Sequence, residues 1–446
     1  MTMKTRRLIA LLFAISFLIS APALILYTAG YRYNIKKQEL NKYGTLVIES
    51  LPRNATITLN NDKETFRTPL RKDNLFPNDY LITVAKDGYY AWQKRLTVYP
   101  QQTTFAENII LFENNQSEAL LNQSVKQVFV APDKNQLLLT YENAGQKVLA
   151  RFNWSDNQLQ DIEKITVGEI SGVSWSRGSD MALITFNTGN TQTTQLYDVN
   201  NLRRIKTVTG NARWSTAEST TIYYLRNNVI STEKIHAGSV TTLYAFKAGS
   251  DIRDFYVNES RLYFINQTEE KQTLNYLDLA DNSAERLHKI DLGHDQYNIR
   301  DFVGNHLVIK NTANDHLVFV NSNLDNILLE EPEVLGYKLN NRENLMLIYD
   351  SSEIALANLN SSPIKFSTSV RVTSGITWAD WYTEPNYLVY LENQALKIIE
   401  LDDRDNRNTL SLPTGLVNFA ALNKKGTEII FTKPDEPGLF TIEISE

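Results

Sequence analysis

The chain has 446 residues, more than a single ordinary domain holds, and its 22 Tyr and 18 Phe against 4 Met favour β structure. Its net charge is −6, and outside the N-terminus its basic residues are scattered among acidic ones, so nucleic acid is not expected as a partner. It contains no cysteine, which excludes disulfides, thiolate metal sites, a cysteine nucleophile and a lipid-modified cysteine anchor.

The first element expected, in residues 1–33, is a basic start followed by a transmembrane helix. Lys4, Arg6 and Arg7 precede an uncharged run of 24 residues that extends from Leu8 to Tyr31. As a helix this run is about 36 Å long, which exceeds the roughly 30 Å of a hydrocarbon core. Because basic residues stay on the cytoplasmic side, we expect a single-pass anchor with an extracytoplasmic body. The positions expected in the membrane include Leu8, Leu12, Phe13, Phe17, Leu24, Leu26 and Tyr27.

A cleavable signal peptide is the alternative for the same segment. Ala21-Pro22-Ala23 supplies the small residues that a signal peptidase needs, and Pro22 is expected to break the helix before them. The apolar run continues through residues 24–27, however, and is longer than the roughly 7 to 15 residues of a secretory apolar region. A retained anchor is therefore favoured, and both interpretations export the body.

A short polar stalk, residues 34–43, is expected next, and then a small β-sandwich over residues 44–112. The hydrophobic pattern changes to a period of two in "GTLVIES", "ATITLN", "YLITVAKDGYY" and "AWQKRLTVYP". Clusters of Pro, Asn, Asp and Gly separate these runs and mark turns. Short half-buried strands with tight turns are typical of a sandwich.

The stretches "IESLPRNATITLN", "TPL" and "LFPNDYLITVAKDGYYAWQKRLTV" resemble the PEGA domain. The matching positions are Pro52, Ala55, Thr68, Pro69, Leu75, Pro77, Tyr80, Gly88 and Tyr89. Asn54 and Asn78 stand where the pattern has glycine, and because Asn tolerates the left-handed region we expect both turns to survive. The resemblance implies a surface-associated, non-catalytic module and no particular ligand.

The aromatic residues of this module are expected to pack in its core and at its edges. A sugar-stacking platform is the less favoured interpretation of the same residues. The residues concerned are Tyr80, Tyr89, Tyr90 and Trp92.

A polar linker, residues 113–124, precedes a repeat that fills residues 125–446. Each copy has an apolar strand, a turn, a very apolar strand and a weaker alternating strand, as in "VSWSRGSDMALITF". The copies are 35 to 46 residues apart, which is the period of a propeller blade. They are anchored at Val130, Trp175, Trp214, Tyr256, Phe302, Tyr337, Trp381 and Ala421.

These repeats resemble the blades of WD40-like and TolB-like β-propellers. Eight copies favour eight blades, with seven as the alternative if one copy is misread. The last copy has three clear strands, so its fourth is expected from residues near the linker. The fold class predicted for the whole chain is therefore all-β, with a transmembrane helix, a PEGA-like sandwich and a propeller.

Candidate sites for chemistry are few. The five histidines have no metal-ligand spacing and are expected at the surface: His236, His288, His294, His306 and His316. The acidic loop Asp402–Asn408 lacks the glycine and the distal glutamate of a calcium loop, so a solvated hairpin tip is favoured over a calcium site at Asp403 and Asp405. No nucleotide-binding or nucleophile-elbow motif is found, and no cofactor or catalytic residue is predicted.

The leading hypothesis is a membrane-anchored, extracytoplasmic binding or scaffolding protein of the cell envelope that is not an enzyme. Its expected partners are the lipid bilayer and either a cell-wall polysaccharide or another envelope protein. The alternative is an exported propeller enzyme acting on glycans or lactones, which requires acidic or histidine side chains meeting at the central channel. A third hypothesis is a structural tether, with the sandwich docked on the wall and the propeller as a spacer.

Overall fold

The chain forms two compact units in the computed structural model. The first contains Met1–Asn115, Ile399–Thr409 and Ile444–Glu446, and the second contains Gln116–Ile398 and Leu410–Glu443. Two stretches that were expected in the propeller therefore lie in the first unit. The residues that the structure describes are 3–28, 30–34, 39–166, 168–189, 191–269, 271–280, 288–324, 327–340, 344–361, 364–373, 375–383 and 386–445.

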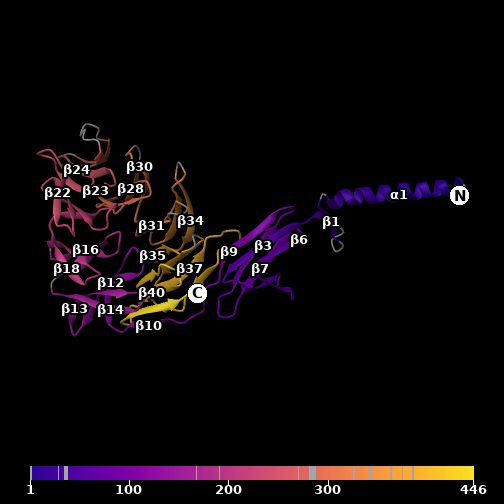
Figure 1. Ribbon diagram of the computed structural model, residues 1–446, viewed down its shortest axis with the longest axis horizontal. Helices are drawn as coiled ribbons and strands as arrows, with labels where there is room; N and C mark the ends of the chain where they lie inside the picture. Colours follow the sequence, from indigo (N-terminus) through magenta and orange to yellow (C-terminus); the bar gives the residue numbers. More distant parts are fainter. Residues whose placement is uncertain are drawn as a thin grey trace. The chain divides into compact units, whose positions relative to one another are not determined.

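The N-terminal element is the helix α1, Met3–Thr28 (Figure 1). Its segment Thr5–Thr28 spans 24 residues and includes an 18-residue window with a mean hydropathy of 2.6, none of which is buried by the rest of the chain. Pro22 lies inside the helix, so the break that was expected there is absent. Length and composition allow α1 to cross a membrane, and a signal sequence has the same two properties.

The expected stalk is a hairpin rather than an extended chain. Strand β1, Tyr31–Asn34, pairs antiparallel with β2, Glu39–Lys42, and the turn between them lies outside the described residues. The Lys42 ammonium lies 4.8 Å from the centroid of the Tyr31 ring, and its Nζ donates to Gln101 Oε1 at 2.9 Å. Because the chain turns back on itself, this segment reaches less far than ten extended residues do.

The sandwich consists of two sheets that enclose one apolar core. One sheet has the order β6-β3-β9, with β3 and β9 parallel, and the other has the order β5-β4-β7-β8. Along β8 every second residue is buried and the residues between them are exposed or partly exposed, so one face of the strand lies in the core. The strands are β3 (Gly44–Leu51), β4 (Thr56–Leu59), β5 (Thr65–Arg67), β6 (Leu70–Leu75), β7 (Asn78–Ala85), β8 (Trp92–Val98) and β9 (Thr103–Ile110).

The second unit contains eight four-stranded antiparallel sheets among the described residues, except that residues 399, 400 and 409 of one sheet belong to the first unit. Each of the eight repeat anchors lies on the first strand of one sheet. The first four sheets contain β11 (Ser124–Val130), β12 (Gln136–Asn143), β13 (Gln146–Asn153), β14 (Gln158–Ile165), β15 (Glu169–Trp175), β16 (Met181–Thr188), β17 (Thr191–Asp198), β18 (Arg203–Val208), β19 (Asn211–Trp214), β20 (Thr221–Arg226), β21 (Val229–Lys234), β22 (Ser239–Ala245), β23 (Ile252–Asn258), β24 (Arg261–Gln267), β25 (Gln272–Asp278) and β26 (His288–Gly293). The next three contain β27 (Tyr297–Val303), β28 (His306–Asn311), β29 (Leu317–Asn321), β30 (Ile327–Glu331), β31 (Gly336–Asn340), β32 (Leu345–Tyr349), β33 (Glu353–Asn358), β34 (Lys365–Arg371), β35 (Ile376–Trp381), β36 (Tyr387–Glu392), β37 (Ala395–Glu400) and β38 (Thr409–Ser411).

The last sheet closes the propeller. It combines β39 (Phe419–Leu422), β40 (Glu428–Thr432) and β41 (Leu439–Glu443) with β10, Glu118–Leu121, which pairs with β41. The segment expected to be a linker thus supplies the fourth strand, as the incomplete last copy indicated. Leu121 and Leu439 share a core with Leu137 and Phe152 of the first sheet, so the last sheet packs against the first. This arrangement is a closed β-propeller.

Candidate functional site

The PEGA-like residues build the turns of the sandwich. Thr68 is buried, its Oγ1 accepts from the N–H of Ala55 at 3.0 Å, and it is hydrogen-bonded to Ser50 Oγ at 2.8 Å. Its backbone exchanges hydrogen bonds with Asn54 and Ala55, which ties the Pro52 turn to the Pro69 turn. This cluster orders the framework, and its polar atoms point at one another rather than at a ligand.

The two asparagines that replace glycine behave differently. Asn54 has φ 63°, in the left-handed region, as was predicted for this turn. The turn between β6 and β7 is also present, but Asn78 has no positive φ and begins strand β7, so this turn does not use the left-handed region at that position. Gly88 has φ 86° and keeps the left-handed turn before Tyr89.

The aromatic side chains of the motif pack as expected. Trp92 lies in the sandwich core, and Tyr80 and Tyr89 pack against it. The Tyr80 hydroxyl donates to the carbonyl of Phe76 at 2.9 Å, and the Tyr89 hydroxyl donates to Glu113 Oε1 at 3.2 Å. Both hydroxyls are therefore engaged within the sandwich.

The acidic loop between β37 and β38 is exposed at its tip, residues 403–406, as expected from the sequence, but it is also docked on the sandwich, which was not expected. It lies in the first unit, where Lys94 of β8 has a fully buried side chain. The Lys94 Nζ is 3.1 Å from Glu400 Oε2 and 3.5 Å from Asp402 Oδ2, and it donates to the carbonyl of Asp402 at 2.6 Å. The N–H of Arg95 donates to Asp405 Oδ2 at 2.8 Å. Lys94 thus pairs with Glu400 and Asp402, whereas Asp403 is 79% exposed and lies 3.8 Å from Arg407.

The same contacts set the charge state of the loop. Burial alone raises the pKa of Asp402, but hydrogen bonds from the Arg404 side chain and backbone, together with the charges of Lys94 and Arg404, lower it to about 2. The guanidinium of Arg404 binds Asp402 through Nε and Nη2 at 2.9 and 2.7 Å, and its Nη1 donates to the carbonyl of Phe105 at 2.8 Å. Asp402 is therefore ionised throughout the neutral and mildly acidic range.

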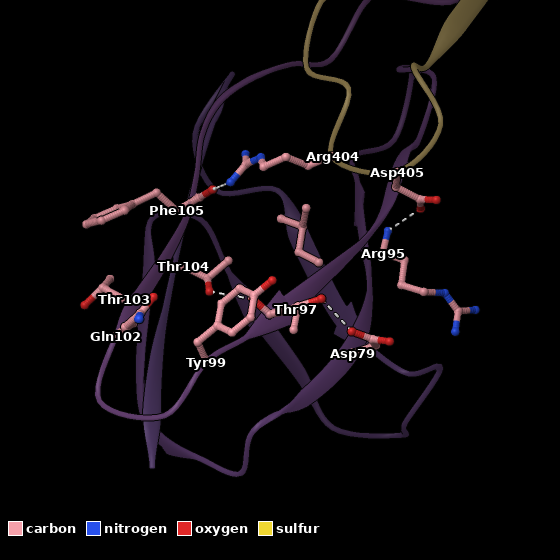
Figure 2. A pocket seen from close by; sticks show the side chains of 11 residues that line it. Asp79, Arg95, Thr97, Tyr99, Gln102, Thr103, Thr104, Phe105, Arg404 and Asp405 are labelled. Carbon is pink, nitrogen blue, oxygen red and sulfur yellow. Dashed lines mark hydrogen bonds between the residues drawn. The ribbon is translucent and has the colours of Figure 1, made fainter. Parts of the chain in front are cut away.

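A cavity of about 540 Å³ lies between this loop and strands β7, β8 and β9 (Figure 2). Arg404 and Asp405 come from the loop, while Asp79 and Arg95 come from β7 and β8. The remaining lining residues are Leu96, Thr97, Tyr99, Gln102, Thr103, Thr104 and Phe105. We call this cavity the sandwich groove.

The chemistry of the sandwich groove is polar but balanced in charge. Two arginines and two aspartates line it, so their formal charges cancel. Tyr99 and Phe105 are 54% and 48% exposed, unlike the packed aromatics of the motif. Exposed rings beside hydroxyl, amide and guanidinium donors suit an uncharged ligand that has many hydroxyl groups and an apolar face.

The sequence did not point to this groove. Two of its charged residues, Asp79 and Arg95, come more than 300 positions before the other two, Arg404 and Asp405. No local motif links the two pairs. Only the exposure of Tyr99 could have been inferred from the sequence. Tyr99 directly follows Val98, the last buried residue of β8, and at that position an apolar side chain gains no contact with the core.

Metal sites are not found among the residues that the structure describes. His236 and His294 are exposed, as predicted. His306 is half-buried, and burial lowers its pKa, so the expectation of a surface position is wrong for it. His316 Nδ1 lies 3.0 Å from Glu330 Oε1, and the His288 side chain lies outside the described part.

Comparison with known proteins identifies the sandwich. Residues 43–109 match the family model of the PEGA domain, which confirms the resemblance seen in the sequence. No curated protein matches the chain.

Among solved structures, the chain is similar to the C-terminal WD40 domain of Sif2, with 12% identity over 73% of this chain and 97% of that chain and a TM-score of 0.49. A eukaryotic initiation factor is similar at 9% identity over 75% and 92% of the two chains, with a TM-score of 0.47. An oligogalacturonate lyase in complex with manganese is similar at 9% identity over 75% and 96%, with a TM-score of 0.44. The propeller assignment itself comes from the sheet order and the repeat. Residues 43–109 therefore form a PEGA domain, which the chain carries between an apolar helix and a β-propeller.

Proposed function

We propose that this chain is a membrane-anchored, extracytoplasmic binding protein of the cell envelope, and that its sandwich groove binds the glycan chains of the envelope. The observation that carries the anchor is α1, whose apolar segment Thr5–Thr28 is covered by no other part of the described chain. A helix that is apolar all round needs an apolar surrounding, and a bilayer supplies one. The basic residues before it favour a cytoplasmic N-terminus.

The ligand class follows from the sandwich groove. Its formal charges cancel, which disfavours a strongly anionic or cationic ligand, and its exposed rings offer faces on which sugar rings stack. The hydroxyls of Thr97 and Thr104 are fixed by hydrogen bonds to Asp79 Oδ1 at 2.6 Å and to the carbonyl of Thr97 at 2.8 Å, so part of the polar lining is preformed. A preformed site avoids the free-energy cost of ordering side chains on binding.

The test is retention of the purified full chain, held in detergent micelles, on insoluble polysaccharide from isolated envelopes. We expect the double substitution Tyr99→Ala and Phe105→Ala to weaken retention by tenfold or more, since each stacking ring contributes about 1 kcal/mol. Phe366→Ala is the matched control, because Phe366 is a similarly exposed ring on the propeller, 42% exposed. Equal retention of wild type and the double variant contradicts the proposal.

An exported propeller enzyme is the second candidate, and one observation favours it. Burial raises the pKa of Asp301 on β27, while the N–H of Phe302 and the charges of Arg213 and Lys338 act in the opposite direction. A carboxyl group with a raised pKa is a candidate general acid. Turnover of chromogenic glycosides that is abolished by Asp301→Asn would establish this function, whereas the binding proposal predicts no turnover by either protein.

A further inference from the structure

The propeller contains a second, larger cavity of about 940 Å³, which we call the propeller groove. It extends over four consecutive sheets, from β15–β18 to β27–β30. Its lining is dominated by threonine, asparagine and arginine, and none of the lining residues that the structure describes is aromatic. The charged residues in it are Arg213, Arg253, Asp254 and Arg300.

Asp254, the one acidic residue among the described residues that line the propeller groove, is already neutralised. Asp254 is 3% exposed, and its Oδ2 lies 2.9 Å from Arg213 Nη2 and accepts from the N–H of Ile299 at 2.8 Å. Its Oδ1 accepts from Asn211 Nδ2 at 2.6 Å and from the N–H of Phe255 at 2.8 Å. These contacts join three neighbouring sheets and leave Asp254 no capacity to neutralise Arg253 and Arg300 as well.

The remaining two arginines occupy equivalent places in adjacent sheets. The sequence Ile-Arg-Asp-Phe occurs at 252–255 and again at 299–302. In both strands the ladder register shifts across the arginine, so Arg253 and Arg300 are the extra residues of two β-bulges. A bulge leaves its residue outside the ladder and re-aims its side chain, and bulges are frequent beside binding sites.

Neither arginine is committed to a strong internal ion pair. Arg253 lies 2.6 Å from Asp251, but both side chains are about half exposed, and exposed pairs contribute little. Arg300 is exposed and forms no ion pair with any residue that the structure describes. The propeller groove thus carries a formal excess of two positive charges in a chain whose net charge is −6.

Arg213 adds a donor that the fold leaves unused. Its guanidinium is held by Asp254 and lies 5.6 Å from the centroid of the Tyr256 ring. Its Nε is buried and has no hydrogen-bond partner among the described residues. A buried unpaired donor is costly, and an oxyanion from a ligand is the kind of acceptor that satisfies it.

We propose that the propeller groove binds a polymer that carries repeated oxyanion groups, phosphate or carboxylate. Arg253 and Arg300 contact successive anionic groups through their planar guanidinium forks, which match the geometry of both kinds of oxyanion. Threonine hydroxyls and the amide of Asn298 bind the polymer backbone between them. This site differs from the sandwich groove in its domain, its net charge and its ligand class.

The experiment measures binding to the full chain in detergent micelles by isothermal titration calorimetry, with inorganic polyphosphate, polygalacturonate and neutral dextran as probes. We expect binding of at least one anionic polymer and none of dextran. Arg253→Gln and Arg300→Gln should each weaken that binding about tenfold, and the double variant about a hundredfold, because each removes charge-assisted hydrogen bonds. Both residues are exposed, so circular dichroism of the variants should match wild type.

Arg371→Gln is the matched control, since Arg371 is an exposed arginine of the same unit that is outside the groove and pairs with Glu353 at 2.7 Å. Binding of polyphosphate alone assigns phosphate as the group recognised, and binding of polygalacturonate alone assigns carboxylate. The proposal is overturned if neither polymer binds, if dextran binds equally well, or if Arg371→Gln weakens binding as much as Arg300→Gln does.

Discussion

The substitution Lys94→Met tests whether an ion pair holds the 399–409 segment on the sandwich. Methionine keeps most of the length of the lysine side chain and removes its charge. Glu400, whose side chain is 5% exposed, then loses the cation that lies 3.1 Å away. Asp402, 23% exposed, loses a weaker contact at 3.5 Å and can be solvated instead.

The expected cost comes mainly from Glu400. Removing one partner of a buried ion pair costs about 3 to 5 kcal/mol, because the other charge stays buried without compensation. Glu400 keeps hydrogen bonds to its Oε2 from Trp92 Nε1 at 3.1 Å and from Asn408 Nδ2 at 2.8 Å, which offset part of the loss. We therefore expect about 3 kcal/mol, which is roughly a hundredfold increase in the opening equilibrium of the segment.

Hydrogen exchange followed by mass spectrometry on the full chain measures this equilibrium for peptides from 92–98 and 399–409. We expect roughly hundredfold faster exchange in Lys94→Met and substantial recovery in Lys94→Met with Glu400→Leu, because the double change removes both buried charges. Lys126→Met, from an exposed pair with Glu142, should leave these peptides unchanged. Unchanged protection in Lys94→Met, or a double variant no better protected than the single one, would show that the ion pair does not hold the segment on the sandwich.

Three further predictions concern the loop, the sandwich turn and the propeller closure. The pKa of Asp402 is depressed to about 2 from its ordinary value of 3.8, so its contribution to loop docking is complete above about pH 4 and is lost as the pH falls toward 2. Pepsin cleavage within 399–409 should rise over that window, and Asp402→Asn should already be cleaved at pH 4. Thr68→Val should destabilise the sandwich by about 1 to 3 kcal/mol in urea unfolding, because the buried N–H of Ala55 loses its acceptor, while Thr68→Ser should stay close to wild type. Leu121→Ala should lower the stability of the propeller by about 2 to 5 kcal/mol, since Leu121 lies in the core shared by the last and first sheets. The control Leu416→Ala, at an exposed position, should cost less than about 0.5 kcal/mol. Equal urea midpoints for the two variants would contradict closure of the propeller by β10.

The parts of the fold that the sequence predicted are those encoded by local periodicity. Leu46 and Ile48 lie in the sandwich core, as their alternation with polar residues predicted. Trp175 and Trp214 lie on the first strands of successive sheets, as the repeat predicted. The left-handed φ of Asn54 was predictable because few residue types tolerate it. Such features depend on residues that are close in the sequence.

The parts that were missed depend on residues far apart in the chain. The "LDDRDNRN" loop looks solvated by composition, and only its contact with Lys94, 308 positions away from Asp402, shows that it is docked. The propeller groove gathers Arg213, Arg253 and Arg300 from three sheets, and no single repeat reveals that their charges add. The sequence indicated the two domain types, whereas both candidate sites required the tertiary structure.

Cysteine labelling in intact cells tests the central claim, a retained anchor with an extracytoplasmic body, most directly. The chain has no cysteine, so each introduced thiol is the sole target of a membrane-impermeant maleimide. Ser155 is exposed on the propeller, and Thr2 precedes the apolar helix. We expect Ser155→Cys to be labelled in intact cells and Thr2→Cys to be labelled only after lysis. Both proteins should stay in the membrane fraction. Labelling of Thr2→Cys but not Ser155→Cys in intact cells, or a mature protein that begins at Leu24, would contradict the central claim.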